Sequence, residues 1–138
     1  MIVVEGEIKD RELIEEIWGP GFGPVEDDDR EGETKVNPLL RKRRVHFTAD
    51  YIGVELRKPV TLLDGETTSL LKLTEPYTGD LVAMDAAKQG MAKLVILLTA
   101  VAGISAGEAR KKIKAGDFIL LSEVLNGFLS DGLLITLT

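Results

Sequence analysis

Hydrophobic and polar residues alternate from Val54 to Leu62, a pattern typical of a β-strand with one buried face. A second strand-like run, Thr67 to Thr74, follows after the dipeptide Asp64-Gly65. This dipeptide favours a two-residue type I′ turn, because both of its residues tolerate positive φ angles. Such a turn sets Leu56 opposite Leu73, which puts apolar side chains of both strands on the same face. We therefore predict a β-hairpin here.

Three helical patterns follow the hairpin, each with apolar residues three and four positions apart. The first runs from about Gly79 to Ala102 and stops at Gly103, a residue that suits the end of a helix. The second opens at Ser105 with a capping box that Glu108 completes. The third carries an apolar stripe from Phe118 to Phe128. The predicted fold class is α+β, with a β-hairpin followed by a three-helix C-terminal part.

The first 45 residues carry weaker patterns and look like an appendage to that domain. Residues 1–18 combine a strand-like repeat with apolar residues at helical spacing, which predicts a short strand-helix extension. Residues 19–45 hold a Gly/Pro-rich stretch and then runs of opposite charge, a composition typical of a flexible, solvated linker. Residues 46–138 contain the β-hairpin and the helices. We expect this domain to fold without the first 45 residues.

Composition is that of a small globular protein and limits its chemistry. The chain has 138 residues, of which 44% are hydrophobic and 29% charged, so it fits one domain with an aliphatic core. It has no cysteine, which excludes disulfides and thiolate chemistry. Its net charge of −6 opposes non-specific binding to nucleic acid. The N-terminus lacks the features of a signal peptide, so we expect a cytoplasmic protein.

Few residues offer catalytic or metal-binding chemistry. His46 is the only histidine, and no helical carboxylate stands at a ligand spacing from it. Three acids, Asp85, Glu108 and Glu123, occupy positions typical of helix surfaces and caps. In the glycine-rich stretch at residues 19–24, prolines replace two of the N–H groups that would bind phosphate. We expect no enzyme activity, no cofactor and no metal site.

A basic tetrad from Arg41 to Arg44 follows an acidic run at residues 26–33. Four adjacent cations can contact a phosphate backbone or an acidic partner. Beside an acidic run, they more often mark an exposed segment without a binding function. The sequence alone allows both interpretations.

A family resemblance is carried by the run VELRKPVTLLDGETTSLLKLTEPYTGDLVAMD, residues 54–85. It combines a strand with a proline, an Asp-Gly turn, a junction of the form L-x-x-P-x-x-G-D-L, and then helices. In these features the chain resembles the phage tail assembly chaperones of the E-protein type, found in contractile-tailed phages. The resemblance covers roughly Tyr51 to Phe128, and residues 1–45 are longer and more charged than the usual start of that family. The junction consists of Leu73, Pro76, Gly79, Asp80 and Leu81.

The resemblance implies a non-enzymatic function in phage tail assembly. Proteins of that family bind the long, helical tape measure protein, keep it soluble during assembly, and leave before the virion is finished. This implies a viral late protein in the cytoplasm of the infected bacterial host. In many relatives a longer form arises by ribosomal frameshifting. Two alternatives are a structural tail or head component and a small nucleic-acid-binding module that uses Arg41 to Arg44.

The helical part carries a large apolar surface, because the segment from Leu94 to Ala102 is apolar around most of its circumference. We expect part of this surface to bind a partner helix, or a second copy of the chain in a homo-oligomer. The alternative is that these side chains fill the domain's own core, in which case the extension with Trp18 and Phe22 is the next candidate. The expected partner-binding residues are Met84, Met91, Phe118, Leu121, Leu125 and Phe128.

Overall fold

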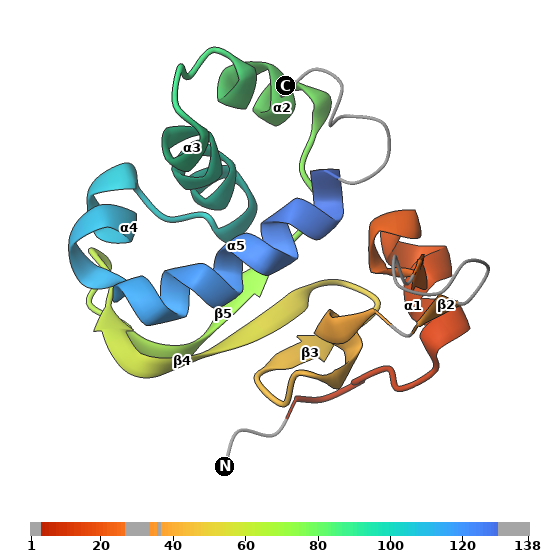
Figure 1. Cartoon of the computed structure of the whole chain (residues 1–138). Coiled ribbons are helices and arrows are strands. Elements are labelled where there is room, and N and C mark those ends of the chain that lie inside the picture. The colour runs from red at the N-terminus through yellow and green to blue at the C-terminus, as the bar shows by residue number, and fades with distance from the viewer. Residues whose placement is uncertain (1–3, 27–33, 36, 130–138) are drawn as a thin grey trace.

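The computed structural model describes residues 4–26, 34–35 and 37–129, and these residues form an α+β fold (Figure 1). Its centre is a three-stranded antiparallel sheet in the order β3-β4-β5. The strands are β3 (Val45–Phe47), β4 (Ile52–Thr61) and β5 (Thr67–Leu73). In the described part of the chain four helices follow the sheet: α2 (Thr78–Asp85), α3 (Gly90–Ala102), α4 (Ala106–Lys112) and α5 (Ala115–Leu129). The α+β class is confirmed; the sheet has one strand more than the predicted hairpin, and one helix more than predicted follows it in the described residues.

The hairpin of β4 and β5 forms where the alternation predicted it, but its turn is longer. The N–H of Leu62 donates to the carbonyl of Glu66 over 2.8 Å, and the N–H of Gly65 donates to the carbonyl of Leu62 over 2.9 Å. These bonds enclose a three-residue loop in which Gly65 has a φ of 89°. No other type of residue has a positive φ in the described segments, so the predicted type I′ turn is wrong. The need for glycine at position 65 is confirmed.

The pairing of the two strands also differs from the prediction, because β4 contains a bulge. Leu73 pairs with Ile52 rather than with Leu56. The irregular stretch lies between Glu55 and Val60. Pro59 falls within it, and a residue without an N–H group is tolerated where the ladder is interrupted. The alternation in the sequence could not reveal this bulge, because the apolar residues on either side of it still point into the core.

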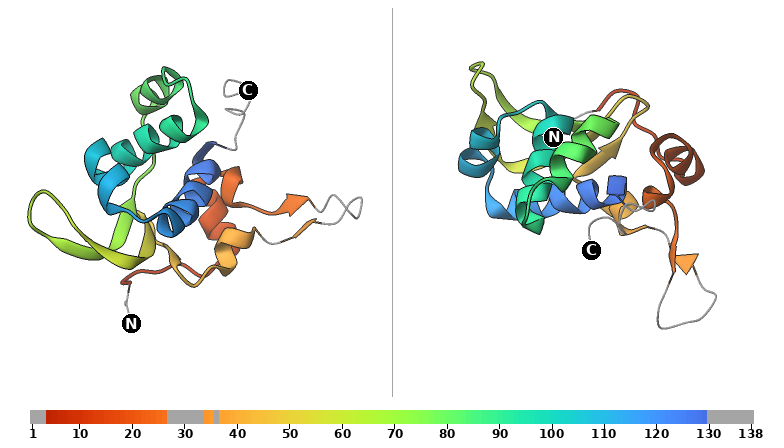
Figure 2. Two further views of the ribbon diagram at one scale, coloured as in Figure 1. Left: turned by 60° about the vertical axis from the view of Figure 1, so that its left-hand side comes forward. Right: turned by 90° about the horizontal axis from the view of Figure 1, so that it is seen from above.

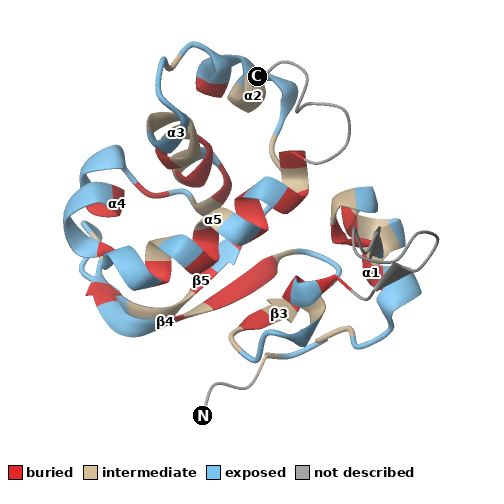
Figure 3. Ribbon diagram, viewed as in Figure 1, coloured by how far each residue is buried: buried red, intermediate tan, exposed pale blue. Residues whose placement is uncertain are grey.

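The first predicted helix is in fact two helices with different surroundings. α2 ends at Asp85 and α3 begins at Gly90, and the backbone of Gln89 between them is extended. α2 buries one side chain, that of Met84, and is otherwise mostly exposed or half-buried (Figure 3). α3 is the buried helix that the apolar run predicted. Its buried residues are Val95, Leu97, Leu98 and Val101.

The later helix boundaries agree closely with the sequence signals. α3 ends at Gly103, which is left-handed with a φ of 69°. The capping box of α4 forms as predicted, since the hydroxyl of Ser105 accepts from the N–H of Glu108 over 3.1 Å and the Glu108 carboxylate accepts from the N–H of Ser105 over 2.9 Å. That carboxylate also accepts from the N–H of Leu63 over 2.8 Å. Glu108 therefore ties α4 to the hairpin turn.

Helices α3 and α5 pack against the sheet and against each other (Figures 1 and 2). α3 contacts β5, and α5 contacts β4. α4 lies beside the tip of the hairpin, and α1 (Arg11–Trp18) lies at the opposite end of the molecule (Figure 1). Between these ends the aliphatic side chains of sheet and helices form one core.

The N-terminal segment contains α1 and the short 3-10 helices η1 (Pro20–Phe22) and η2 (Pro38–Arg41). The predicted strand before α1 is absent from the described residues 4–10, where Ile8 makes a single backbone bond to Phe47, of 2.7 Å. The predicted helical turns are confirmed as α1, which Asp10 caps through the N–H of Glu12 at 2.9 Å. A short ladder, β1 (Val25–Glu26) and β2 (Thr34–Lys35), projects from the body (Figure 2).

Parts of the predicted extension and linker are buried in the common core. Trp18 and Leu39 are each 7% exposed, and Phe22 is fully buried. The indole N–H of Trp18 donates to the carbonyl of Thr48 over 2.9 Å, which satisfies its one polar group. The description of residues 19–45 as a solvated linker is therefore wrong for the segments around Phe22 and Leu39.

Phe22 joins the N-terminal segment to the sheet and to α5. Its ring packs edge-on against Phe47 and Phe128, with centroid distances of 5.7 and 5.5 Å. Gly127 of α5 provides the space for this ring, since a Cβ at that position would lie 2.5 Å from an edge carbon of Phe22. This shared core argues against independent folding of residues 46–138.

Candidate functional site

The structure places the expected partner-binding residues in three different environments. Three are buried in the core, namely Met84, Leu121 and Leu125. Two are half-buried and pack against the core, namely Phe118 and Phe128. Met91 is the one that is well exposed, at 62%. The structure thus does not bring the six residues together on one surface.

Three large exposed side chains lie on or directly before the neighbouring helices α2 and α3. Tyr77 immediately precedes α2, Val82 lies within α2, and Met91 lies in the first turn of α3; their exposed fractions are 82%, 67% and 62%. α2 and α3 pack against each other, and the N–H of Tyr77 is held by the carboxylate of Asp80 at 2.8 Å. We call these three side chains the α2–α3 surface.

The exposure of Val82 follows from helix geometry. Residues two positions apart lie about 200° apart around a helix, so burial of Met84 turns Val82 towards solvent. Leu121 and Ile119 of α5 have the same relation, and Ile119 is 61% exposed. A helical wheel centred on Met84 would have identified Val82 from the sequence. The sequence alone did not show that Met84 is the residue of α2 that points into the core.

The basic tetrad divides into one structural arginine and three residues at the surface. The guanidinium of Arg44 lies 2.5 Å from the carboxylate of Asp117, and its Nε donates to the carbonyl of Glu55 over 2.9 Å. Arg41, Lys42 and Arg43 are exposed. The prediction that the tetrad lies in a solvated segment therefore holds for these three residues and fails for Arg44.

Asp117 holds the bulge of β4 against the start of α5. Its side chain is 2% exposed and accepts from the backbone N–H groups of Arg57, at 2.9 Å, and Lys58, at 3.2 Å, in addition to Arg44. Burial by itself raises the pKa of Asp117, but the hydrogen bonds from Arg57, Lys58 and Arg44 outweigh it, so the pKa lies below its usual value. In the sequence Asp117 stands directly before the apolar stripe that begins at Phe118, a position typical of a helix start. Its contacts could not be predicted, because its partners are distant in the chain.

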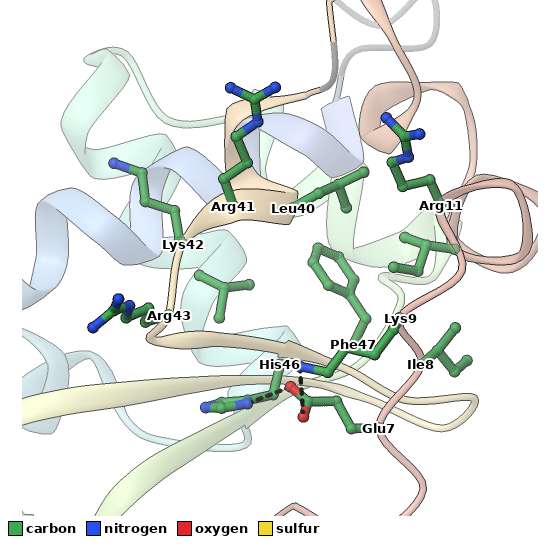
Figure 4. Close-up of a pocket in the computed structure, with 12 residues that line it drawn as sticks. Glu7, Ile8, Lys9, Arg11, Leu40, Arg41, Lys42, Arg43, His46 and Phe47 are labelled. Atoms are coloured by element: carbon green, nitrogen blue, oxygen red, sulfur yellow. Dashed lines mark hydrogen bonds and ion pairs between the residues drawn. The ribbon is translucent and has the colours of Figure 1, made fainter.

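A pocket of about 450 Å³ lies between the N-terminal segment and residues 40–47 (Figure 4). We call it the basic pocket, because five cationic residues line it: Lys9, Arg11, Arg41, Lys42 and Arg43. In Figure 4 the side chains of Arg11 and Arg41 extend along one side, while Glu7 and His46 lie together on the other. The apolar part of the lining consists of Ile8, Ile14, Leu40, Val45 and Phe47. The sequence indicated the tetrad but not its proximity to Lys9 and Arg11.

His46 connects the N-terminal segment to the sheet at the edge of this pocket. Its Nδ1 lies 2.5 Å from a carboxylate oxygen of Glu7, and its Nε2 lies 3.0 Å from one of Glu55. Burial lowers the pKa of His46, but hydrogen bonds to Glu55 and Glu7 raise it more, so the pKa lies above its usual value. For Glu7 burial raises the pKa, but the bonds to His46 and Lys9 lower it below the usual value. The sequence showed neither partner of His46.

Within the described residues no group of three or more His, Cys, Asp or Glu side chains could hold a metal ion, and the two carboxylates beside His46 lie on opposite ring nitrogens. In the same part of the chain no single helix is long and apolar enough to cross a membrane; α3 and α4 meet that criterion only as a pair, bent by 112°. Comparison with protein-family models, with curated proteins and with solved structures found no match.

Proposed function

We propose that this protein is a phage tail assembly chaperone that binds a tape measure protein through its α2–α3 surface and keeps it soluble without catalysis. The observation that carries the proposal is the exposure of Tyr77, Val82 and Met91. The junction on which the family resemblance rests leads directly into this surface, since Gly79, Asp80 and Leu81 form the first turns of α2. With this function the protein would act in the cytoplasm of an infected bacterial host.

The chemistry of the α2–α3 surface suits an apolar helix as partner. Large apolar side chains contribute most of the binding free energy when a contact excludes water, and an amphipathic helix presents such side chains at regular spacing. α2 has one buried side chain, that of Met84, and one partly buried side chain against the core, that of Leu81. A helix with so little buried surface can adjust its position at small cost, which favours binding to a long partner with many similar segments.

Co-expression with a tape measure protein from a contractile-tailed phage tests this proposal. The wild-type chain should increase the soluble fraction of the tape measure protein and co-elute with it in size-exclusion chromatography. The double variant Val82→Gln and Met91→Gln should lose both effects while its circular dichroism stays unchanged, because both side chains are exposed. Ile119→Gln is the matched control, since Ile119 is similarly exposed on another helix.

That experiment and an assay of purified phage particles separate the alternatives. If the double variant keeps the partner soluble as well as the control does, the α2–α3 surface is not the binding site. If the wild-type protein is found in purified particles, it is a structural component and does not leave before the virion is finished. Of the basic tetrad, a nucleic-acid-binding module could use only Arg41 to Arg43, because Arg44 is paired with Asp117.

A further inference from the structure

We propose that the basic pocket binds an acidic segment of a protein partner that inserts an apolar side chain. The pocket lies on the N-terminal segment and the sheet rather than on the α2–α3 surface. The inference therefore goes beyond the proposed function and does not depend on it. It rests on the charge of the pocket, on the apolar residues within it, and on the side chains that flank it.

The charge of the pocket is opposite to that of the whole chain. The net charge is −6, yet five cationic residues line this pocket against one carboxylate, that of Glu7. Glu7 is already engaged by His46 and by Lys9, the latter at 3.2 Å. Among the residues that the structure describes, Arg11, Arg41 and Arg43 form no ion pair, so their guanidinium groups are available to carboxylates. Arginine binds carboxylates with two parallel hydrogen bonds.

The apolar lining of the pocket is fixed by the core. Ile14, Val45 and Phe47 are buried residues of the core cluster, and Ile8 and Leu40 are partly buried against it. A volume of about 450 Å³ lies within the range of about 300–1,000 Å³ typical of ligand pockets. An aliphatic or aromatic side chain can occupy such a space while its acidic neighbours contact the surrounding arginines. A purely charged ligand would make no use of the apolar lining.

The same residues favour a peptide over a nucleic acid. Proteins that bind single strands stack bases on exposed aromatic rings, but Phe47, the aromatic residue of this pocket, is 3% exposed. A phosphate backbone also has no apolar group that could occupy the part of the pocket lined by Ile8, Leu40 and Val45.

Fluorescence anisotropy with a synthetic peptide tests the inference. The probe is a labelled peptide of glutamate and aspartate with a leucine and a phenylalanine at its centre. Two control peptides are needed: in one the leucine and phenylalanine are replaced by serine, and in the other the acids are replaced by glutamine and asparagine. The probe should bind the full chain more tightly than both controls, and the binding should weaken as salt concentration rises.

Two matched sets of variants locate the binding. The first variant combines three substitutions in one chain: Arg11→Gln, Arg41→Gln and Arg43→Gln. Its affinity for the probe should be about tenfold or more lower, corresponding to the loss of three arginine contacts. The control variant removes the same charge at exposed positions outside the pocket, through Lys88→Gln, Arg110→Gln and Lys111→Gln. Its affinity for the probe should change by less than about twofold. All six positions are exposed, so both chains should fold. The single variant Arg41→Gln provides a milder test of the same contact.

Three results would overturn the proposal. The first is equal weakening by the two sets of variants, which would show a non-specific charge effect. The second is equal affinity for the probe and for its serine control, which would show that the apolar lining does not take part. The third is displacement of the probe by a single-stranded oligonucleotide of equal charge that binds more tightly, which would make the pocket a nucleic-acid site.

Discussion

Replacement of Asp117 by alanine should be among the most destabilising single changes in this protein. The carboxylate is almost completely buried and accepts from two backbone N–H groups of β4 and from the guanidinium of Arg44. Alanine would leave all three donors without this acceptor. A buried donor that loses its partner costs about 1–3 kcal/mol, and a broken buried ion pair costs about 3–5 kcal/mol. We expect a loss of about 4 kcal/mol, because Arg44 is partly exposed and can recover some hydration.

Urea unfolding followed by far-ultraviolet circular dichroism measures this loss. With a total free energy of unfolding of about 5–15 kcal/mol for a domain of ordinary size, the variant should unfold at a much lower urea concentration. Asp85→Ala is the control, because Asp85 is an exposed carboxylate whose ion pair with Lys93 spans 3.6 Å. Such surface pairs contribute about 0–1 kcal/mol.

The pH dependence gives an independent test of the same contact. The pKa of Asp117 is lower in the folded chain than in the unfolded chain. The contribution of the Asp117 carboxylate to the free energy of unfolding is therefore complete above the unfolded pKa and is lost as pH falls through the folded pKa. The stability difference between wild type and variant should shrink as pH falls below about 4. A loss below about 1 kcal/mol at neutral pH, or a difference that does not shrink in acid, would refute the assigned role of Asp117.

Four further changes have defined outcomes. Gly127→Ala should lower the free energy of unfolding by about 1 kcal/mol, since overpacking against Phe22 costs more than the gain in helix propensity, and Phe22→Leu in the same chain should reduce that loss in a double-mutant cycle. Gly65→Val should destabilise by about 1 kcal/mol or more, because Gly65 has a φ of 89°; an unchanged melting temperature would contradict this. Deletion of residues 1–45 should abolish cooperative thermal unfolding, and retention of a sharp transition would show that the remainder folds alone. His46→Gln should lower the free energy of unfolding more at acid than at alkaline pH in denaturant titrations. The pKa of His46 is higher in the folded chain than in the unfolded chain. Its contribution to stability is therefore complete below the unfolded pKa and is lost as pH rises through the folded pKa.

The features that the sequence predicted correctly are local ones. Gly65 and Gly103 adopt positive φ angles, and Ser105 with Glu108 forms the expected capping box. Each of these signals depends on the backbone within a few residues, so a single segment of sequence contains the necessary information. The alternation of apolar and polar residues in β4 likewise predicts one buried face, whichever element covers that face.

The features that the sequence did not predict depend on contacts between distant segments. Phe22 is buried because Gly127 leaves room for its ring, and these residues are far apart in the chain. Asp117 accepts from N–H groups that only the bulge of β4 frees. The choice between Met84 and Val82 as the inward residue of α2 depends on where α2 docks. Periodicity alone therefore located the helical segments but merged α2 with α3, and half of the residues that it suggested for partner binding are buried in the core.

Hydrogen–deuterium exchange on the complex tests the central proposal most directly, because it reports the protected segment without any mutation. The protein is measured alone and after co-purification with a tape measure protein. We expect new protection from Tyr77 to Met91, the segment that carries the α2–α3 surface, while the slowly exchanging amides of α5 change little. Protection confined to α1 and η1, or no protection in the segment from Tyr77 to Met91, would contradict the proposal.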